Sequence, residues 1–353
     1  MSEKYTWLNY AYGIRPTYPK VKSGKLGASK ALEKASRYFG AHFGCKPHEI
    51  RFAQNITTHV AEIVNAIKQS ETDVPVLVDS HQVKYVKMAL EQGSLPEEHM
   101  TRPNYASVKQ MRFSPSEVSS FDPVDFVKNP AKYVASHGRQ VIVLSHVSRL
   151  TGEKFPIRRV YSEIKKLNPH AILIVDGAQA VGAINFKAKG TCDAYIGTNS
   201  KFIDAEPNLA PAYITSKLRK LMGESSFSAE EMHSELVSTV SALRHPSISS
   251  FDFTPIKQMR AYALQKLKDV NGVEVFRVNN QAAHILTLKV KSAEETRRIV
   301  SELERRKVHV FHNLDWSEHQ PQDALLRVSL SVKTKKEEID HLVRELKEVT
   351  REE

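Results

Sequence analysis

Two side chains of opposite charge follow two apolar runs in the middle of the sequence. Asp176 comes directly after the unbroken apolar run of residues 171 to 175, and Lys201 comes shortly after a second run at residues 195 to 197. Such a run is typical of a strand that is buried on both faces of a parallel sheet. Open α/β sheets bind ligands where their strands end, so we expect a ligand site at Asp176. A lysine amine near that site could form a Schiff base with a carbonyl compound.

This pair of residues suits one cofactor in particular. Pyridoxal phosphate needs a lysine for its aldehyde, an acid that keeps its pyridine nitrogen protonated, and donors for its phosphate. Lys201 and Asp176 could fill the first two roles, and Thr57, Thr198 and Ser200 could hold the phosphate. Spacing alone leaves an alternative equally open, in which Lys201 is a solvated loop residue and Asp176 caps a helix.

Two further strand ends could contribute polar groups. Residues 54 to 58 follow a short expected strand and begin a helical pattern, so their N–H groups and hydroxyls could bind an anion such as phosphate. The more common alternative is that Asn55 or Thr57 simply caps the helix. His81 follows the expected strand at residues 75 to 78. A histidine there is more often a hydrogen-bonded structural residue, but it would share its edge of the sheet with the other loops.

Strands and helices alternate along most of the chain, which predicts an α/β fold with a parallel sheet. We expect a large domain at residues 26 to 250 and a smaller α+β domain at residues 251 to 353. Residues 1 to 25 are expected to form an extended arm that packs with the small domain or with the active site. The polar segment 95 to 125 is expected to be irregular, and the serine-rich segment 223 to 250 to mark a boundary.

Composition is ordinary for a globular protein, with 41% hydrophobic and 26% charged residues among 353. The net charge is +11, but the basic residues are scattered over expected helix faces, so we predict no nucleic-acid partner. The two cysteines stand far apart without metal-ligand spacing, which predicts a reducing compartment and no metal site. Because no apolar signal segment or membrane-length run is present, we expect a cytoplasmic protein without a membrane partner.

Seven short motifs carry a resemblance to a known family. They are Leu8-Asn-Tyr-Ala-Tyr-Gly13 with Pro16, Asn55-Ile-Thr57, Ser80-His81, His146-Val-Ser148 with Gly152, Val175-Asp-Gly-Ala-Gln-Ala180, Tyr195-Ile-Gly-Thr-Asn-Ser-Lys201 and Arg327-Val-Ser329. In this order they resemble the class V aminotransferase family of pyridoxal-phosphate enzymes, and most of all its isopenicillin N epimerase-like branch, which also holds cysteine desulfurase relatives. The resemblance implies fold type I, with a mostly parallel seven-stranded sheet, a smaller C-terminal α+β domain, and a homodimer.

The resemblance also implies roles around the cofactor. Lys201 would form the Schiff base with pyridoxal 5'-phosphate and then act as the general base at the α carbon of the substrate. Asp176 would bind the pyridinium nitrogen, and His81 would stack on the ring. The other cofactor-binding residues would be Ile56, Thr57, Ser148, Gln179, Thr198 and Ser200, with Gln179 on the phenolic oxygen.

The substrate would be an α-amino acid or an amino-acid derivative held by its carboxylate. Arg327 would bind that carboxylate, because a planar guanidinium offers two parallel hydrogen bonds that a lysine cannot. Asn9 would be a further substrate-binding residue. The family often has asparagine where Arg149 stands, so Arg149 could bind an additional acidic group of the substrate; the alternative is a salt bridge to Glu153.

The expected reaction follows from the family and from one departure. Proton removal by Lys201 can lead to transamination, to β-elimination or to epimerisation. Cysteine desulfurases carry a nucleophilic cysteine shortly before the substrate arginine, and residues 311 to 326 contain none. We therefore predict an aminotransferase or a β-eliminating lyase and exclude a desulfurase that forms a cysteine persulfide. The alternatives are an amino-acid epimerase and, from another class, a non-catalytic binding or regulatory protein.

Two other positions bear on the dimer and on the substrate. The family's Gly-Thr, whose threonine reaches the phosphate of the partner subunit, is replaced by Ala242-Leu243, which puts that contact in question. Residues 311 to 322, with His312, Trp316 and His319, are expected to border the substrate.

Overall fold

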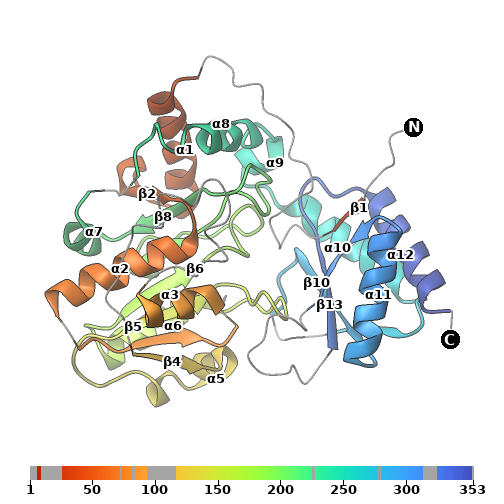
Figure 1. Ribbon diagram of the computed structural model, residues 1–353, viewed down its shortest axis with the longest axis horizontal. Helices are drawn as coiled ribbons and strands as arrows, with labels where there is room; N and C mark the ends of the chain where they lie inside the picture. Colours follow the sequence, from red (N-terminus) through yellow and green to blue (C-terminus); the bar gives the residue numbers. More distant parts are fainter. Residues whose placement is uncertain are drawn as a thin grey trace.

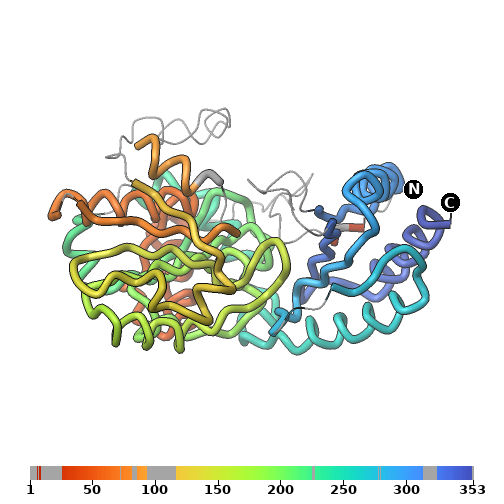
Figure 2. Tube along the Cα trace, turned by 90° about the horizontal axis from the view of Figure 1, so that it is seen from below, coloured from red at the N-terminus to blue at the C-terminus, as the bar shows by residue number. Residues whose placement is uncertain are grey.

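The structure is a computed structural model that describes residues 6–8, 26–71, 73–81, 84–93, 117–224, 227–276, 278, 280–312 and 324–351. It has two lobes, which lie side by side in Figures 1 and 2. The larger lobe contains a long sheet covered by helices on both faces. The smaller lobe contains the described residues from Thr254 onwards together with residues 6 to 8, and it packs against one end of the larger lobe.

A seven-stranded sheet forms the centre of the large lobe. Its strand order is β2-β8-β7-β6-β5-β3-β4, and only β8 runs antiparallel to its neighbours. The strands are β2 (Ile50–Ala53), β8 (Ala210–Ile214), β7 (Ala194–Ile196), β6 (Ile172–Asp176), β5 (Val141–Ser145), β3 (Val76–Asp79) and β4 (Val118–Phe121). Every residue of β5, β6, β7 and β8 is buried, as their apolar runs require. The predicted mostly parallel seven-stranded sheet is confirmed.

Helices cover both faces of this sheet. One apolar core lies beneath α2 (Ile56–Ser70), α3 (Lys84–Gln92) and α7 (Ser216–Met222). The other lies beneath α1 (Ala28–Phe43), α6 (Ile157–Leu167) and α8 (His233–Ala242). The remaining elements of this lobe are α5 (Pro123–Lys128), α9 (Pro246–Ser249) and the 3-10 turns η1 (Pro47–Glu49) and η4 (Pro130–Lys132).

Two segments that were expected to be irregular or to form a boundary contain regular structure. β4 lies within the segment 95 to 125 and pairs with β3 as the edge strand of the sheet. Its central residues Ser119 and Ser120 are exposed, so no apolar run marks it. α8 lies within the serine-rich segment and buries polar side chains, including Ser238 and Thr239, which hides its inward face from a search for apolar periodicity.

The small lobe is an antiparallel sheet of four strands backed by helices, which confirms the predicted α+β architecture. Its strand order is β12-β13-β10-β9, with the strands β12 (Phe311–His312), β13 (Ala324–Ser329), β10 (Ile285–Val290) and β9 (Val273–Val275). Three helices pack on it: α10 (Thr254–Leu267), α11 (Ala293–Arg305) and α12 (Lys336–Val349). The short strand β1 (Thr6–Trp7) pairs in parallel with β11 (Val308–His309), and Leu8 lies in the same core. The division between residues 250 and 251 stays a prediction.

Two searches concern the described part of the chain only. Among these residues, none of the helices combines the length and the apolar character that crossing a bilayer requires. The same residues contain no group of three or more His, Cys, Asp and Glu side chains that could hold a metal ion.

Candidate active site

Five loops meet at one edge of the large sheet. They follow β2, β3, β5, β6 and β7, which all run in the same direction because β8 alone is reversed. In chain order the loops carry Ile56 and Thr57, then His81, then Ser148 and Arg149, then Asp176 and Gln179, and finally Thr198, Ser200 and Lys201. The register places Asp176 opposite Ser145 on one side and opposite Ile196 on the other. The parallel sheet therefore brings together residues that are far apart in sequence.

Lys201 and Asp176 form the charged centre of this edge. The Asp176 side chain is buried, and its Oδ1 accepts a hydrogen bond of 2.7 Å from the backbone N–H of Ala178. Burial lowers the pKa of the Lys201 amine to about 7; Arg327 and Arg149 act in the same direction, and Asp176 opposes them. An amine with this pKa is partly neutral near pH 7, so Lys201 can act as a nucleophile or as a base.

His81 is held by Ser148. Ser148 Oγ lies 3.0 Å from His81 Nδ1 and also accepts the backbone N–H groups of Leu150 and Thr151. The two accepted N–H groups occupy both lone pairs of Oγ. Its single proton is therefore donated to Nδ1, and the proton of the ring lies on Nε2. Burial lowers the pKa of His81 to about 4, so the imidazole is neutral. Ser148 thus fixes the orientation of a flat, uncharged ring.

The start of α2 offers hydrogen-bond donors. Asn55 caps the helix, since its side-chain oxygen accepts the backbone N–H of Thr58 at 2.8 Å. The predicted N-cap is therefore present, and it satisfies one backbone N–H of the first turn. The N–H groups of Ile56 and Thr57 have no carbonyl acceptor within the helix. Thr198 Oγ1 and Ser200 Oγ lie 3.3 Å apart in the loop before Lys201. These hydroxyls and N–H groups suit a phosphate.

Arg327 enters the site from the small lobe. It lies on β13 with 2% exposure, its Nη1 donates to the backbone carbonyl of Arg149, and its guanidinium carbon lies 4.0 Å from the centre of the Phe311 ring. Burial, together with the charge of Arg149, lowers the pKa of Arg327 to about 9. The sequence assigns Phe311 no role of its own; it begins the segment 311 to 322 that we expect to border the substrate.

Gln179 and Asp79 complete the buried polar groups. Gln179 is 5% exposed and its backbone carbonyl accepts a hydrogen bond from His284 Nε2. Asp79 ends β3 and accepts the backbone N–H of Ser145 at 2.6 Å. Burial and the neighbouring Asp176 raise the pKa of Asp79 to about 7. The sequence could not indicate this shift, because it depends on burial and on contacts formed in the fold.

Some predicted residues lie outside the described part of the chain. Asn9 and all of residues 313 to 323, which include Trp316 and His319, belong to this group. The described start of that segment, Phe311 and His312, forms β12 beside Arg327. The expectation that the segment borders the substrate therefore stays a prediction.

The turn after Asp176 depends on a glycine. A Cβ atom at Gly177 would lie 2.5 Å from Cε1 of Tyr195, whose hydroxyl is 2.8 Å from His146 Nδ1. Tyr195 is 1% exposed and cannot move aside without disturbing the core. We therefore expect Gly177→Ala to lower the free energy of unfolding by about 1–3 kcal/mol, as overpacking does. Urea unfolding of the cofactor-free protein measures this; Gly27→Ala, where nothing lies within 4 Å, is the control and should change stability by less than about 1 kcal/mol.

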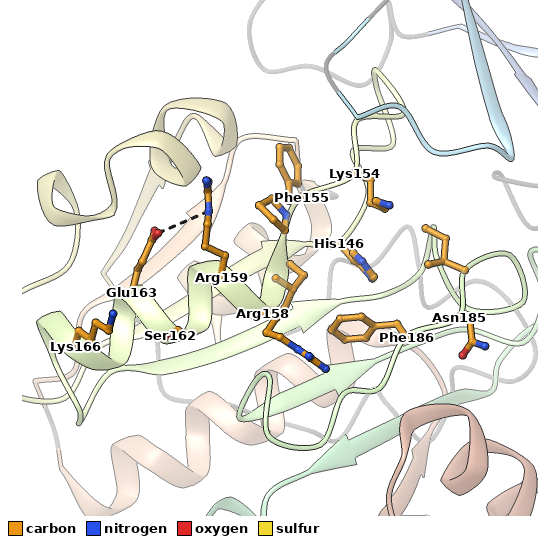
Figure 3. Close-up of a pocket in the computed structure, with 13 residues that line it drawn as sticks. His146, Lys154, Phe155, Arg158, Arg159, Ser162, Glu163, Lys166, Asn185 and Phe186 are labelled. Carbon is orange, nitrogen blue, oxygen red and sulfur yellow. Dashed lines mark ion pairs between the residues drawn. The ribbon is translucent and has the colours of Figure 1, made fainter.

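A cavity of about 600 Å³ lies beside this turn, but none of the predicted site residues lines it. Figure 3 shows His146 and Phe186 on one side and the start of α6, with Arg158 and Arg159, on another. His146 lines the cavity and also contacts a loop of the site, because its backbone N–H donates to the carbonyl of Asp176 at 2.8 Å.

Neither cysteine of the chain is an activated thiol. Cys192 is fully buried in the large-lobe core, and burial raises its pKa. Burial and the nearby Glu49 raise the pKa of Cys45 to about 11. A thiol acts as a nucleophile in its ionised form, so both residues are structural.

The groups at this edge fit pyridoxal phosphate. Lys201 supplies an amine with a lowered pKa, Asp176 supplies a buried carboxylate for a ring nitrogen, and the start of α2 with Thr198 and Ser200 supplies donors for a phosphate. Arg327 adds a buried cation that a carboxylate could satisfy.

Comparisons with known proteins agree with this arrangement at the level of the fold. No protein-family model and no curated protein matches the sequence. A solved structure of the enzyme C-DES with glycine covalently linked to its pyridoxal-phosphate cofactor has a TM-score of 0.74 and 15% identity, over 98% of this chain and 96% of its own. A NifS-like protein has a TM-score of 0.71 and 15% identity, over 99% and 100%. The cysteine desulfurase from Thermococcus onnurineus NA1 has a TM-score of 0.72 and 12% identity, over 99% and 95%.

These neighbours correct one expectation. The sequence led us to exclude a persulfide-forming desulfurase and to favour an aminotransferase or a β-eliminating lyase. That prediction is contradicted in its exclusion, because cysteine desulfurases are prominent among the similar structures. The match in architecture covers almost the whole chain and includes both lobes. The chain therefore has the fold of the fold-type-I pyridoxal-phosphate-dependent enzymes.

Proposed function

We propose that this protein is a pyridoxal-phosphate-dependent enzyme that cleaves the carbon–sulfur bond of cysteine or of a cysteine derivative, in the manner of the desulfurase group. The observation that carries the proposal is the buried pair of Lys201 and Asp176 at the edge of the sheet, with the pKa of Lys201 lowered to about 7. The choice of a sulfur amino acid is supported by the similar structures, which include cysteine desulfurases and a cystine C–S lyase.

Each residue has a defined task in this proposal. When bound, pyridoxal phosphate supplies an electron sink for the carbanion at the α carbon of the amino acid. Asp176 holds a proton on the ring nitrogen, which its buried carboxylate favours by charge. Lys201 Nζ takes the proton from the α carbon, and Arg327 orients the amino acid by its carboxylate.

Three further groups keep the ring in place. His81, fixed by Ser148, covers one face of the ring as a neutral imidazole. Gln179 donates to the phenolic oxygen, and the α2 start with Thr198 and Ser200 binds the phosphate. Binding of a homodimer partner, a cytoplasmic location and membership of the epimerase-like branch stay predictions.

Arg149 is proposed to recognise a second acidic group on the substrate. Its carbonyl contacts Arg327, and its charge lowers the pKa of Arg327, Lys201 and His81, so its guanidinium lies within electrostatic reach of all three. One carboxylate of the substrate can pair with only one of the two guanidinium groups in a two-point bond. L-Cystine, which has a second carboxylate beyond its sulfur atoms, would satisfy the other.

Arg149→Gln should therefore lower kcat/KM for L-cystine by about 10–100-fold, the effect of losing one charged hydrogen bond. For L-cysteine the same variant should change kcat/KM by less than about threefold. Arg158→Gln, the same substitution at an exposed position of α6, is the matched control. An equal loss of kcat/KM for both substrates would show that Arg149 does not bind the second acidic group.

The lowered pKa of Lys201 makes a prediction about cofactor loading. The neutral amine attacks the aldehyde, so the rate at which the cofactor-free protein takes up pyridoxal phosphate should rise with pH around a midpoint near 7. The appearance of an absorbance band near ~420 nm follows the reaction. Nα-acetyl-lysine, with a pKa of about 10.4, is the control and should keep rising tenfold per pH unit up to about pH 10. The same profile for the protein would mean that Lys201 is not perturbed.

The proposal is tested by adding L-cysteine together with dithiothreitol, or L-cystine without a reductant, to the cofactor-loaded protein. In the L-cystine arm, dithiothreitol is added only after the protein has been removed, because it reduces L-cystine to L-cysteine. Sulfide should be released many times faster than with free pyridoxal phosphate. A protein that shows the ~420 nm band but releases no sulfide from either amino acid would refute the proposed reaction while leaving the cofactor in place. Keto-acid formation from unrelated amino acids under the same conditions would also count against it.

A further inference from the structure

The small lobe contacts the two cofactor-site loops of the large lobe at two separate points. His284, just before β10, bonds through Nε2 to the backbone carbonyl of Gln179. Lys333, in the turn after β13, places Nζ 3.0 Å from Oδ2 of Asp204. Gln179 lies three residues after Asp176, and Asp204 lies three residues after Lys201. Both contacts therefore end close to the charged centre of the site.

The chain after Lys201 is shared between the two lobes. Phe202 is fully buried in the small-lobe core, and its ring meets the His284 ring edge to face at 4.6 Å. The next residue, Ile203, is fully buried in the large-lobe core. Asp204 then adopts the left-handed conformation with φ +64°, which is uncommon for a residue other than glycine. A shift of one lobe against the other must therefore move the chain next to Lys201.

The same short segment also touches the turn that carries Gln179. A Cβ atom at Gly182 would lie 2.8 Å from the backbone nitrogen of Ile203. The loop that begins at Asp176 and the loop that holds Lys201 are thus in direct backbone contact, and His284 contacts both of them, one by its ring and the other by Nε2.

His284 is built as a neutral donor. It is 0% exposed, and burial lowers its pKa to about 3, so the imidazole carries one proton. Since the Gln179 carbonyl can only accept, that proton lies on Nε2. Nδ1 is buried and has no hydrogen-bond partner among the described residues. The imidazole therefore makes one directed hydrogen bond and one ring contact, while its second nitrogen makes no hydrogen bond within the described residues.

We infer that His284 is a positioning residue of the cofactor site, which transmits the orientation of the small lobe to Gln179 through its Nε2–H and to Lys201 through Phe202, with the Lys333–Asp204 ion pair as a second contact. The inference rests on the proposed function, because its readout is the cofactor bound at Lys201. His284 does not touch the reacting atoms, and it acts only through its two neighbours.

Two substitutions separate the functions of the imidazole. His284→Gln keeps an N–H donor at a reach similar to that of Nε2 but loses the ring, and His284→Phe keeps the ring but loses the donor. In the cofactor-loaded protein, the intensity of the ~420 nm band is followed as a function of pH. His284→Phe should shift the midpoint of this titration by at least ~0.5 pH unit. Its kcat/KM should fall by about 10-fold or more, as a small misplacement of catalytic groups does. His284→Gln should recover most of both losses.

The ion pair supplies an independent arm that leaves the core intact. Lys333→Met should shift the same midpoint in the same direction, and Lys268→Met, at an exposed lysine of the same lobe, should leave it unchanged. If His284→Phe and Lys333→Met lower the melting temperature but keep the wild-type midpoint and kcat/KM, both residues are merely structural and the inference is wrong. A wild-type protein that never develops the band would instead refute the proposed function.

Discussion

Lys201→Ala is expected to lower the rate of carbon–sulfur bond cleavage by at least ~10⁴-fold, because it removes both the amine that binds the cofactor and the base at the α carbon. The ~420 nm band should also disappear, while pyridoxal phosphate can still bind without a covalent bond. Steady-state sulfide release and the absorbance spectrum measure the two effects. The burial that lowers the pKa of Lys201 to about 7 is the structural reason for choosing this lysine among the many in the chain.

The control for this variant is Lys217→Ala, which removes an exposed lysine from α7. It should keep both the band and the activity. If Lys201→Ala kept the band while Lys217→Ala or another lysine variant lost it, the covalent site would lie elsewhere on the chain.

Asp176→Asn is expected to lower kcat/KM by roughly 10³-fold, since an amide cannot stabilise a positive charge on the ring nitrogen in a buried site. The change is nearly isosteric, and the amide oxygen can still accept the backbone N–H of Ala178. A loss of activity would therefore report the missing charge more than a change in the fold. Steady-state kinetics at saturating cofactor, together with the melting temperature, separates the two.

The matched control is Asp79→Asn, which changes another buried carboxylate at the end of β3, two strands away from β6 in the sheet. Its amide oxygen can still accept the N–H of Ser145, and burial already raises the pKa of Asp79 to about 7. Activity should stay within about fivefold of the wild type, as expected for a buried acid that is half neutral near pH 7. Equal losses in both variants would mean that any buried carboxylate at this edge matters, and Asp176 would lose its assigned role.

Much of the fold could be predicted because burial leaves a simple pattern in the sequence. The strands β5 and β6 are apolar up to their last residues, Ser145 and Asp176, since both faces of the sheet are covered. β4 was missed because it lies at the edge of the sheet and exposes its serines. α8 was missed because it buries hydroxyl groups whose hydrogen bonds the sequence does not reveal, such as Thr239 Oγ1 to the Glu235 carbonyl.

The site could be predicted as far as it depends on strand ends. Asp176 and Lys201 follow two neighbouring parallel strands, so local patterns were enough to place them together. The contacts made by His284, Lys333 and Phe311 could not be found in this way. They join segments of the small lobe to loops more than a hundred residues earlier, or to another strand of the same sheet, and the packing of the two lobes decides them.

The excluded reaction shows a different limit. The absence of a cysteine between residues 311 and 326 was taken to exclude a desulfurase. Breaking the bond between carbon and sulfur depends on the lysine, the acid and the cofactor, whereas the thiol that accepts the sulfur is a separate component. A missing acceptor at one position therefore says little about the bond that is broken, and cysteine desulfurases share the fold of this chain.

The central claim is that Lys201 is the covalent attachment point of the cofactor, and one measurement tests it directly. The protein is loaded with pyridoxal phosphate, reduced with borohydride to make the bond permanent, digested, and analysed by mass spectrometry. The account expects the added pyridoxyl group on the peptide that contains Lys201 and on no other. A reduced protein that carries the group on another lysine, or that carries none, would contradict it.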